Sequence, residues 1–255
     1  MRRLLSFECQ GQCLAASLDE GLGETGLLMV TGGTQVRVGS HRMYEKLARS
    51  LAGAGVSSFR FDRRGVGDSE GEDPDFRDSG PDIAAAAAAF RSEAPEVERV
   101  VGFGLCDGAT AIALHGAAAG LDGLILVNPW LTEAQSGQPA PAAVRRHYRD
   151  RLLSVAGWKK LLTGAVDLRK LVGGLRRGAD TSQSSLALDA AAALMERRLP
   201  TAVILCRDDA TAVAARHELK RRELRDTKSG ELSLLDVEGG FVAIGHSPAT
   251  ELFRG

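Results

Sequence analysis

The hydrophobic residues of the chain gather in short runs that alternate with longer stretches of helical spacing. The short apolar runs predict buried strands at residues 27–30, 56–61, 100–103, 124–127 and 202–205, with a further candidate at 232–237. Apolar residues at helical spacing predict helices at 44–51, 81–90 and 109–119. Alternating strands and helices build a mostly parallel sheet with helices on both faces, so the pattern predicts an α/β fold. Ligands bind such sheets beyond the carboxyl ends of the strands, which directs the search for a site to those loops.

The alternation is interrupted between residues 128 and 198. About 70 residues stand where a simple crossover needs far fewer, so we expect a single domain, residues 1–255, with a helical cap insertion at about 130–198. Residues 145–177 of this insertion hold ten Lys or Arg and two Asp. The basic stretch is either a solvated face balanced by acids elsewhere or a lid that attracts anionic substrates or an anionic surface.

Composition and charge narrow the class of protein. The chain has 32 Lys and Arg against 33 Asp and Glu, a net charge of −1, which argues against a general nucleic-acid binder. No apolar run approaches the roughly 20 residues of a membrane span. The amino-terminal apolar run is too short for a signal peptide, so we expect a cytoplasmic protein.

The four cysteines do not have the spacing of a zinc site. Cys9 and Cys13 are expected to be ordinary thiols of an amino-terminal hairpin, and Cys206 a residue that fills a strand. Nothing in the sequence predicts a metal or an organic cofactor.

The strongest chemical signal is the pentapeptide Gly104-Leu105-Cys106-Asp107-Gly108, which lies between a predicted strand and a predicted helix. It has the pattern of a G-x-S-x-G nucleophile elbow, with Cys in place of Ser. Side chains two residues before and after the nucleophile would collide in so tight a turn, which explains Gly104 and Gly108. The amino terminus of the following helix is expected to lower the pKa of the thiol. The alternative is a buried Cys in a glycine-rich turn.

A cysteine nucleophile requires a base, and in this type of fold the chain order is nucleophile, acid, His. His246 follows the last strand candidate, so it is the expected base; a surface-loop His is the alternative. The other downstream histidines lie in the elbow helix, the basic insertion and an apparent helix: His115, His147 and His217.

The loop after the strand expected at 202–205 should supply the acid that orients the base. Asp209 is the first candidate and Asp208 the second, and one of them could instead only cap a helix that begins near Thr211.

An acyl-transfer site also needs two backbone N–H donors for the oxyanion. One should be the N–H of Asp107. The other should come from the loop after the first parallel strand, at Thr34 or Gln35, where Gly32 and Gly33 allow close approach of a ligand. A plain tight turn would also explain these glycines.

Several of these residues resemble those of known families. The stretch 61–71, Phe-Asp-Arg-Arg-Gly-Val-Gly-Asp-Ser-Glu-Gly, is similar to the F-D-x-R-G-x-G-x-S loop of the α/β-hydrolase superfamily. Residues 32–42, the elbow and residues 147–158 together resemble the exosortase A system-associated hydrolases, type 1. This resemblance implies an α/β-hydrolase fold and a link to bacterial exopolysaccharide and exosortase loci, but it does not imply a substrate.

The carboxyl-terminal part departs from the family pattern. Related proteins place the base in an Asp-His turn before a full helix, whereas residues 238–246 read Glu-Gly-Gly-Phe-Val-Ala-Ile-Gly-His and nine residues follow. A cysteine elbow also occurs in dienelactone-hydrolase-like enzymes, so the thiol itself is compatible with hydrolysis.

These features predict a hydrolase of an ester, lactone or thioester with Cys106, Asp209 and His246 as its catalytic residues. The expected partner is a small-molecule acyl substrate, anionic if the basic insertion covers the site. Two alternatives remain open: an acyltransferase on the same scaffold and a catalytically silent scaffold that binds a partner. The oligomeric state is left open.

Overall fold

The computed structural model describes residues 1–132, 185–197, 199–206, 209, 211, 212, 214 and 215. Its first two strands, β1 (Arg2–Cys9) and β2 (Gln12–Asp19), form an antiparallel hairpin with Arg2 opposite Asp19 and Cys9 opposite Gln12. The two-residue turn has φ of 52° at Gln10 and 77° at Gly11, the left-handed backbone that matches the twist of a tight hairpin. Cys9 and Cys13 are therefore thiols of an amino-terminal hairpin, as predicted.

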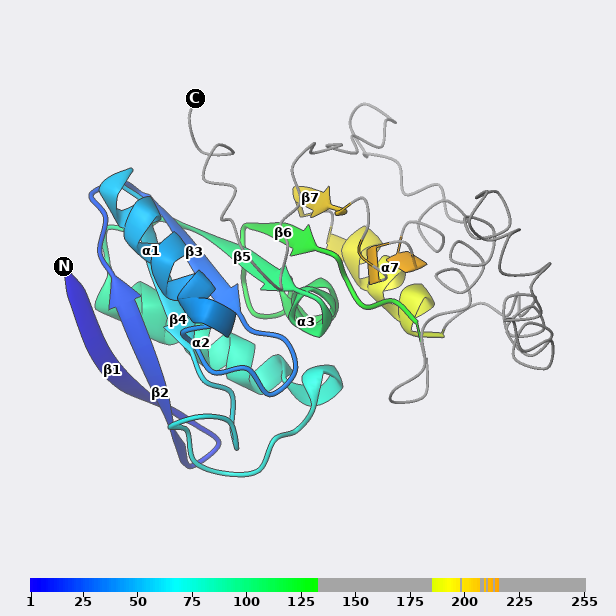
Figure 1. Cartoon of the computed structure of the whole chain (residues 1–255), viewed down its shortest axis with the longest axis horizontal. Helices are drawn as coiled ribbons and strands as arrows, with labels where there is room; N and C mark the ends of the chain where they lie inside the picture. Colours follow the sequence, from blue (N-terminus) through cyan, green and yellow to red (C-terminus); the bar gives the residue numbers. More distant parts are fainter. Residues whose placement is uncertain (133–184, 198, 207–208, 210, 213, 216–255) are drawn as a thin grey trace, which may run out of the picture.

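The other described strands complete one seven-stranded sheet of order β1-β2-β4-β3-β5-β6-β7. They are β3 (Thr25–Val30), β4 (Ser57–Phe61), β5 (Arg99–Leu105), β6 (Gly123–Val127) and β7 (Thr201–Ile204). The hairpin joins through an antiparallel β2–β4 pair, and the pairs from β4 through β3, β5 and β6 to β7 are parallel. In Figure 1 the hairpin lies at one edge of the sheet and β7 at the other. The carboxyl ends of the parallel strands meet along one side of this sheet.

Helices cover both faces of the sheet. They are α1 (Met43–Gly53), α2 (Gly80–Glu93), α3 (Asp107–His115) and α7 (Ser185–Arg197), with short 3-10 turns η1 (Ser40–Arg42) and η2 (Phe76–Asp78). Successive residues of β3 alternate between the faces: Leu27 and Met29 pack with α1, whereas Leu28 and Val30 belong to the larger core under α2, α3 and α7. Phe90 of α2 stacks on Phe59 of β4, with ring centroids 5.4 Å apart.

The predicted mostly parallel α/β sheet is confirmed, and the predicted strands and helices that fall on described residues are present. The strand candidate at 232–237 lies outside the described residues. Most of the predicted insertion at 130–198, including its basic stretch, also lies outside them, and α7 falls at its end. In the part of the chain that the structure describes, no helix is both long enough and apolar enough to cross a membrane.

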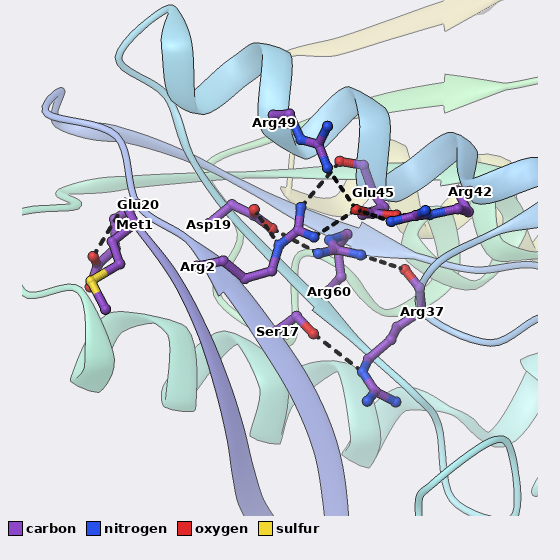
Figure 2. Close-up of polar contacts among 10 residues, drawn as sticks. All are labelled: Met1, Arg2, Ser17, Asp19, Glu20, Arg37, Arg42, Glu45, Arg49 and Arg60. Carbon is purple, nitrogen blue, oxygen red and sulfur yellow. Dashed lines mark hydrogen bonds and ion pairs between the residues drawn. The ribbon is translucent and has the colours of Figure 1, made fainter.

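A network of buried charges connects the hairpin to the rest of the sheet (Figure 2). Asp19 of β2 accepts hydrogen bonds from the buried Arg60 of β4 and from Arg2 of β1, each at 2.7 Å. Arg2 also reaches Glu45 of α1 at 2.7 Å. Arg60 donates to the carbonyl of Arg37 at 3.1 Å, so the network extends to the loop that follows β3. Charges removed from water need such partners, because an unpaired buried charge is strongly destabilising.

Candidate functional site

Cys106 stands between β5 and α3 on a strained peak of the backbone. Its φ of 59° and ψ of −125° lie in a region that residues with a side chain rarely adopt. Hydrogen bonds on both sides hold this conformation: its N–H donates to the carbonyl of Val127 at 3.0 Å, and its carbonyl accepts from the N–H of Trp130 at 3.1 Å. The strand, sharp turn and helix have the local architecture expected of a nucleophile elbow.

The two elbow glycines leave room for this turn. A Cβ at Gly104 would lie 2.5 Å from the carbonyl oxygen of Gly108 and 2.6 Å from the backbone nitrogen of Ala109. A Cβ at Gly108 would lie 2.6 Å from the carbonyl oxygen of Val30, at the end of β3. Both contacts involve backbone atoms, which cannot swing away, so the turn tolerates only glycine at these two positions.

The environment of the thiol differs from the expectation. Burial, together with the negative charges of Asp107 and, more weakly, Asp209, raises the pKa of Cys106 to about 11. The N–H of Asp107 and the side chain of Thr211 hydrogen-bond to the sulfur and lower the pKa, but these effects are smaller in sum. The predicted lowering by the helix terminus is therefore wrong in its net sign, because desolvation and two carboxylates outweigh it.

The same interactions place Asp209 and Thr211 beside the sulfur, just beyond the end of β7. The Oδ1 atom of Asp209 accepts the N–H of Ala212 at 2.8 Å, so this carboxylate also caps the following helical turn. Asp209 thus makes the helix-cap contact considered from the sequence and lies near the thiol, while its role as the site acid stays a prediction. Asp208, the second candidate, and His246, the expected base, lie outside the described residues.

The loop after β3 lies against the elbow through Asp107. Its carboxylate accepts the N–H of Gly33 with both oxygens, at 2.7 and 2.8 Å, and the N–H of Gly108 at 3.0 Å. The N–H of Gln35 donates to the carbonyl of Gly32 at 3.2 Å, which removes Gln35 as a free oxyanion donor in this conformation. Among the described residues, no group accepts the N–H of Thr34. Of the two donors predicted for this loop, Thr34 is thus the one whose N–H is free within the described part of the chain.

The loop after β4 contacts the loop after β3 through two buried charged residues, Asp62 and Arg63. Asp62, which is fully buried, accepts the N–H of Arg37 and pairs with its guanidinium. Arg63, also buried, donates through Nη2 to the carbonyl of Gly33 at 2.6 Å. Arg64 instead pairs with the buried Asp82 at 2.6 Å. The sequence motif at 61–71 pointed to a superfamily but did not show that its two arginines have different partners.

Tyr44 is a residue of this region that the sequence pattern placed only as an apolar helix position. Its ring packs edge-on against Phe103 of β5, with centroids 6.0 Å apart, and its buried hydroxyl has no hydrogen-bond partner among the residues that the structure describes. Burial raises the pKa of this hydroxyl, and the charges of Asp107 and Cys106 raise it further, so the phenol lies close to the elbow. No sequence pattern indicates that Tyr44 lies near the elbow, because its burial beside that turn depends on the tertiary structure.

His115, the one downstream histidine that falls on described residues, lies apart from the thiol. The Nε2 atom of His115, at the far end of α3, is 2.7 Å from the carbonyl oxygen of Arg77. His147 and His217 lie outside the described residues. Within the described ranges, no cluster of three or more His, Cys, Asp or Glu side chains could hold a metal ion.

Comparison with known proteins identifies the architecture. Residues 37–214 match the family model described as serine aminopeptidase, S33. An esterase from Pyrococcus furiosus superposes with a TM-score of 0.57 at 14% identity, covering 87% of this chain and 76% of the esterase. The α/β-hydrolase GrgF from Penicillium sp. superposes with a TM-score of 0.57 at 15% identity, covering 86% of each chain. At these identities the superpositions show a shared fold.

Matches among curated proteins are local. A stretch of 70 residues is 41% identical to a thioredoxin reductase of Streptomyces coelicolor and covers 27% of this chain and 22% of that protein. A stretch of 32 residues is 69% identical to a thioredoxin reductase of Mycolicibacterium smegmatis and covers 12% of this chain and 10% of that protein. The chain therefore spans about a fifth or less of the curated relatives that it matches, and these matches assign it no activity.

Proposed function

Since the chain belongs to the α/β-hydrolase family described as serine aminopeptidase, S33, we propose that it hydrolyses an ester, lactone or thioester with Cys106 as the nucleophile. The observation that supports the proposal is the position of Cys106 on a strained strand-to-helix turn, with the loop after β3 bound to the neighbouring Asp107 and with Asp209 near the thiol. A thiol held in this way at the carboxyl edge of a parallel sheet can meet an acyl carbon while backbone donors meet its oxygen.

The raised pKa of Cys106 determines how the first step must proceed. With a pKa of about 11, the thiol is neutral near pH 7, so a base must take its proton as the sulfur attacks. We assign this base to His246, oriented by Asp209. The S–C bond forms, the carbonyl π electrons move to the oxygen, and the oxyanion meets the N–H groups of Asp107 and Thr34. Collapse of the tetrahedral adduct expels the alcohol or thiol, which takes the proton from His246.

Water completes the cycle. His246 accepts a proton from a water molecule as that water attacks the acyl-thioester carbonyl, and the carboxylic acid leaves as the sulfur regains its proton. The ten basic residues of 145–177 favour an anionic acyl chain or carrier as the substrate. The resemblance of residues 32–42 and 147–158 to the exosortase A system-associated hydrolases supports a role in bacterial exopolysaccharide systems.

Turnover tests the proposal. The wild type and Cys106→Ala are compared on p-nitrophenyl esters and on a small acyl thioester, with Cys13→Ala, an exposed cysteine, as the matched control. We expect turnover by the wild type and by Cys13→Ala, and a loss of at least about 10³-fold in Cys106→Ala. Equal turnover by Cys106→Ala and the wild type would eliminate this mechanism.

A catalytically silent scaffold is the second candidate, and the raised pKa of the thiol favours it. The carboxylate of Asp107 on the N–H of Gly33 is a second observation in its favour, because it brings negative charge to the loop that should bind an oxyanion. Such a scaffold would turn over neither class of substrate, and alkylation of Cys106 would be no faster than that of an ordinary buried thiol. Rapid acylation confined to Cys106 excludes it.

A further inference from the structure

Arg63 is a buried cation whose one close hydrogen bond to the described residues goes to the loop after β3. It follows Asp62 at the end of β4, is 2% exposed, and donates through Nη2 to the carbonyl oxygen of Gly33 at 2.6 Å. The carboxylate of Asp73 is farther from the same nitrogen, at 3.6 Å. Its Nε and Nη1 atoms are buried, and no described residue accepts a hydrogen bond from them. The guanidinium therefore makes its main contact with one peptide group of the candidate site.

That contact fixes the direction of a neighbouring donor. A trans peptide is planar, and its C=O and N–H point in opposite directions. The carbonyl of Gly33 belongs to the same peptide plane as the N–H of Thr34, so holding that oxygen against Arg63 turns the N–H of Thr34 away from the buried guanidinium. The preceding peptide is engaged at both ends, by Gln35 at the carbonyl of Gly32 and by Asp107 at the N–H of Gly33. Thr34, which is exposed, keeps its N–H available.

We propose that Arg63 is a positioning residue for acyl transfer: by binding the carbonyl of Gly33 it aims the N–H of Thr34 as the second oxyanion donor. This assignment rests on the proposed function, because it gives Arg63 a role in the acylation of Cys106. Arg63 itself touches neither the thiol nor the acyl group.

Stability alone does not account for Arg63. Buried N–H groups without a partner destabilise a fold, and replacement of such a cation by an apolar side chain of similar length is often neutral or stabilising. The adjacent Arg64 differs, because its Nε atom lies 2.6 Å from the fully buried Asp82 and its backbone N–H donates to the same carboxylate at 3.0 Å. The unused donors of Arg63 destabilise the fold, and native proteins retain such destabilising groups mainly at functional sites. Arg63 lies next to a candidate catalytic loop, which agrees with a functional role.

The experiment compares two reactions of the same thiol in the full-length protein. Acylation by p-nitrophenyl acetate, measured as the pre-steady-state burst, develops an oxyanion, whereas alkylation by iodoacetamide does not. In Arg63→Met we expect acylation to slow by about 10²-fold through kcat, with KM little changed. Alkylation of Cys106 should stay within about twofold, because the thiol itself is unchanged. Arg63→Lys, which keeps a donor, should restore part of the acylation rate.

Thermal unfolding separates positioning from general damage. Arg63→Met should unfold at the wild-type temperature or above, whereas the matched variant Arg64→Met, which leaves the buried Asp82 unpaired, should unfold at a lower temperature. Unchanged acylation in Arg63→Met, or parallel loss of acylation and alkylation, overturns the inference while leaving Cys106 as the nucleophile. A wild type that is not acylated on Cys106 overturns the proposed function, and this role of Arg63 with it.

Discussion

Arg60 lies in the carboxyl-terminal half of β4, and Cys106 directly follows β5 in the same sheet, but their surroundings differ in charge. Arg60 meets the carboxylate of Asp19, which also binds Arg2, and the network continues to Glu45 and its three arginines (Figure 2). Cys106 instead lies near two carboxylates that raise the pKa of its thiol. Opposite charges around Arg60 stabilise the hairpin against the sheet. The negative charges near Cys106 instead disfavour the thiolate form of its side chain. Such unfavourable arrangements of charge are concentrated at functional sites.

The largest effect should come from breaking the Arg60 network. Asp19→Ala leaves the buried Arg60 without its carboxylate, so we expect a loss of about 3–5 kcal/mol in the free energy of unfolding. The neighbouring Glu20→Ala removes half-exposed ion pairs with Arg3 and the amino terminus and should cost less than about 1 kcal/mol. Urea unfolding of both variants measures the difference. If both variants lost similar free energy of unfolding, the buried Asp19–Arg60 pair would be no more stabilising than the half-exposed pairs of Glu20, which would contradict the account.

A smaller loss in the free energy of unfolding should follow from adding a side chain at an elbow glycine. Gly104→Ala places a Cβ 2.5 Å from the backbone oxygen of Gly108 and should destabilise the fold by about 1–3 kcal/mol while disturbing the turn at Cys106. Gly53→Ala, at the end of α1 with open space around the new methyl group, should be neutral or stabilise by about 0.4–1 kcal/mol. Thermal and urea unfolding measure both changes. A neutral Gly104→Ala would contradict the tight elbow.

The charge environment of the thiol can be altered without removing a contact. In the wild type, alkylation of Cys106 by iodoacetamide should rise about tenfold per pH unit from pH 7 to 10, because its pKa is about 11. Asp107→Asn keeps an acceptor for the N–H of Gly33 but removes the charge, so its rate at pH 8 should be severalfold higher. Asp189→Asn, on the exposed side of α7, is the matched control. A plateau below pH 9, or no gain in Asp107→Asn, would refute this electrostatic picture.

Acid should weaken the network around Glu45. Hydrogen bonds from Arg42 and Arg2 lower the pKa of Glu45 to about 2, below the ordinary value of 4.5 for the unfolded chain. A lowered pKa stabilises the fold above the unfolded value, and this contribution is lost as the pH falls from about 4.5 through about 2. The difference in unfolding free energy between the wild type and Glu45→Gln should therefore shrink across that interval. A difference that does not change with pH would contradict the ion pairs.

Much of the sheet and the elbow could be predicted because their determinants are local. The run Leu124 to Val127 is apolar enough to be a buried strand anywhere, and Gly104 is required by a steric contact with Gly108 within the elbow itself. Gly108, in contrast, is required by the close approach of the end of β3, which is distant in sequence. The strand order could not be read in this way, because β4 lies between β2 and β3 only through pairings distant in sequence.

The electrostatics of the site could not be predicted from the same residues. The sequence predicts a helix directly after the elbow, at 109–119, and from that a lowered pKa of the thiol. It could not show how deeply the sulfur is buried, or that Asp209 approaches it from a strand end a hundred residues away. Nor could it show that Arg64 pairs with the fully buried Asp82 whereas Arg63 donates to the carbonyl of Gly33, because both arginines stand in one motif.

The most direct test of the account is the mass of the protein trapped early in its reaction with p-nitrophenyl acetate. After acid quenching and proteolysis, the account predicts one acetyl group on the peptide that contains Cys106, formed at the rate of the burst and absent from Cys106→Ala. Hydrolysis that continues without any acetyl group on that peptide, or an acetyl group that forms on a different residue at the same rate, would contradict it.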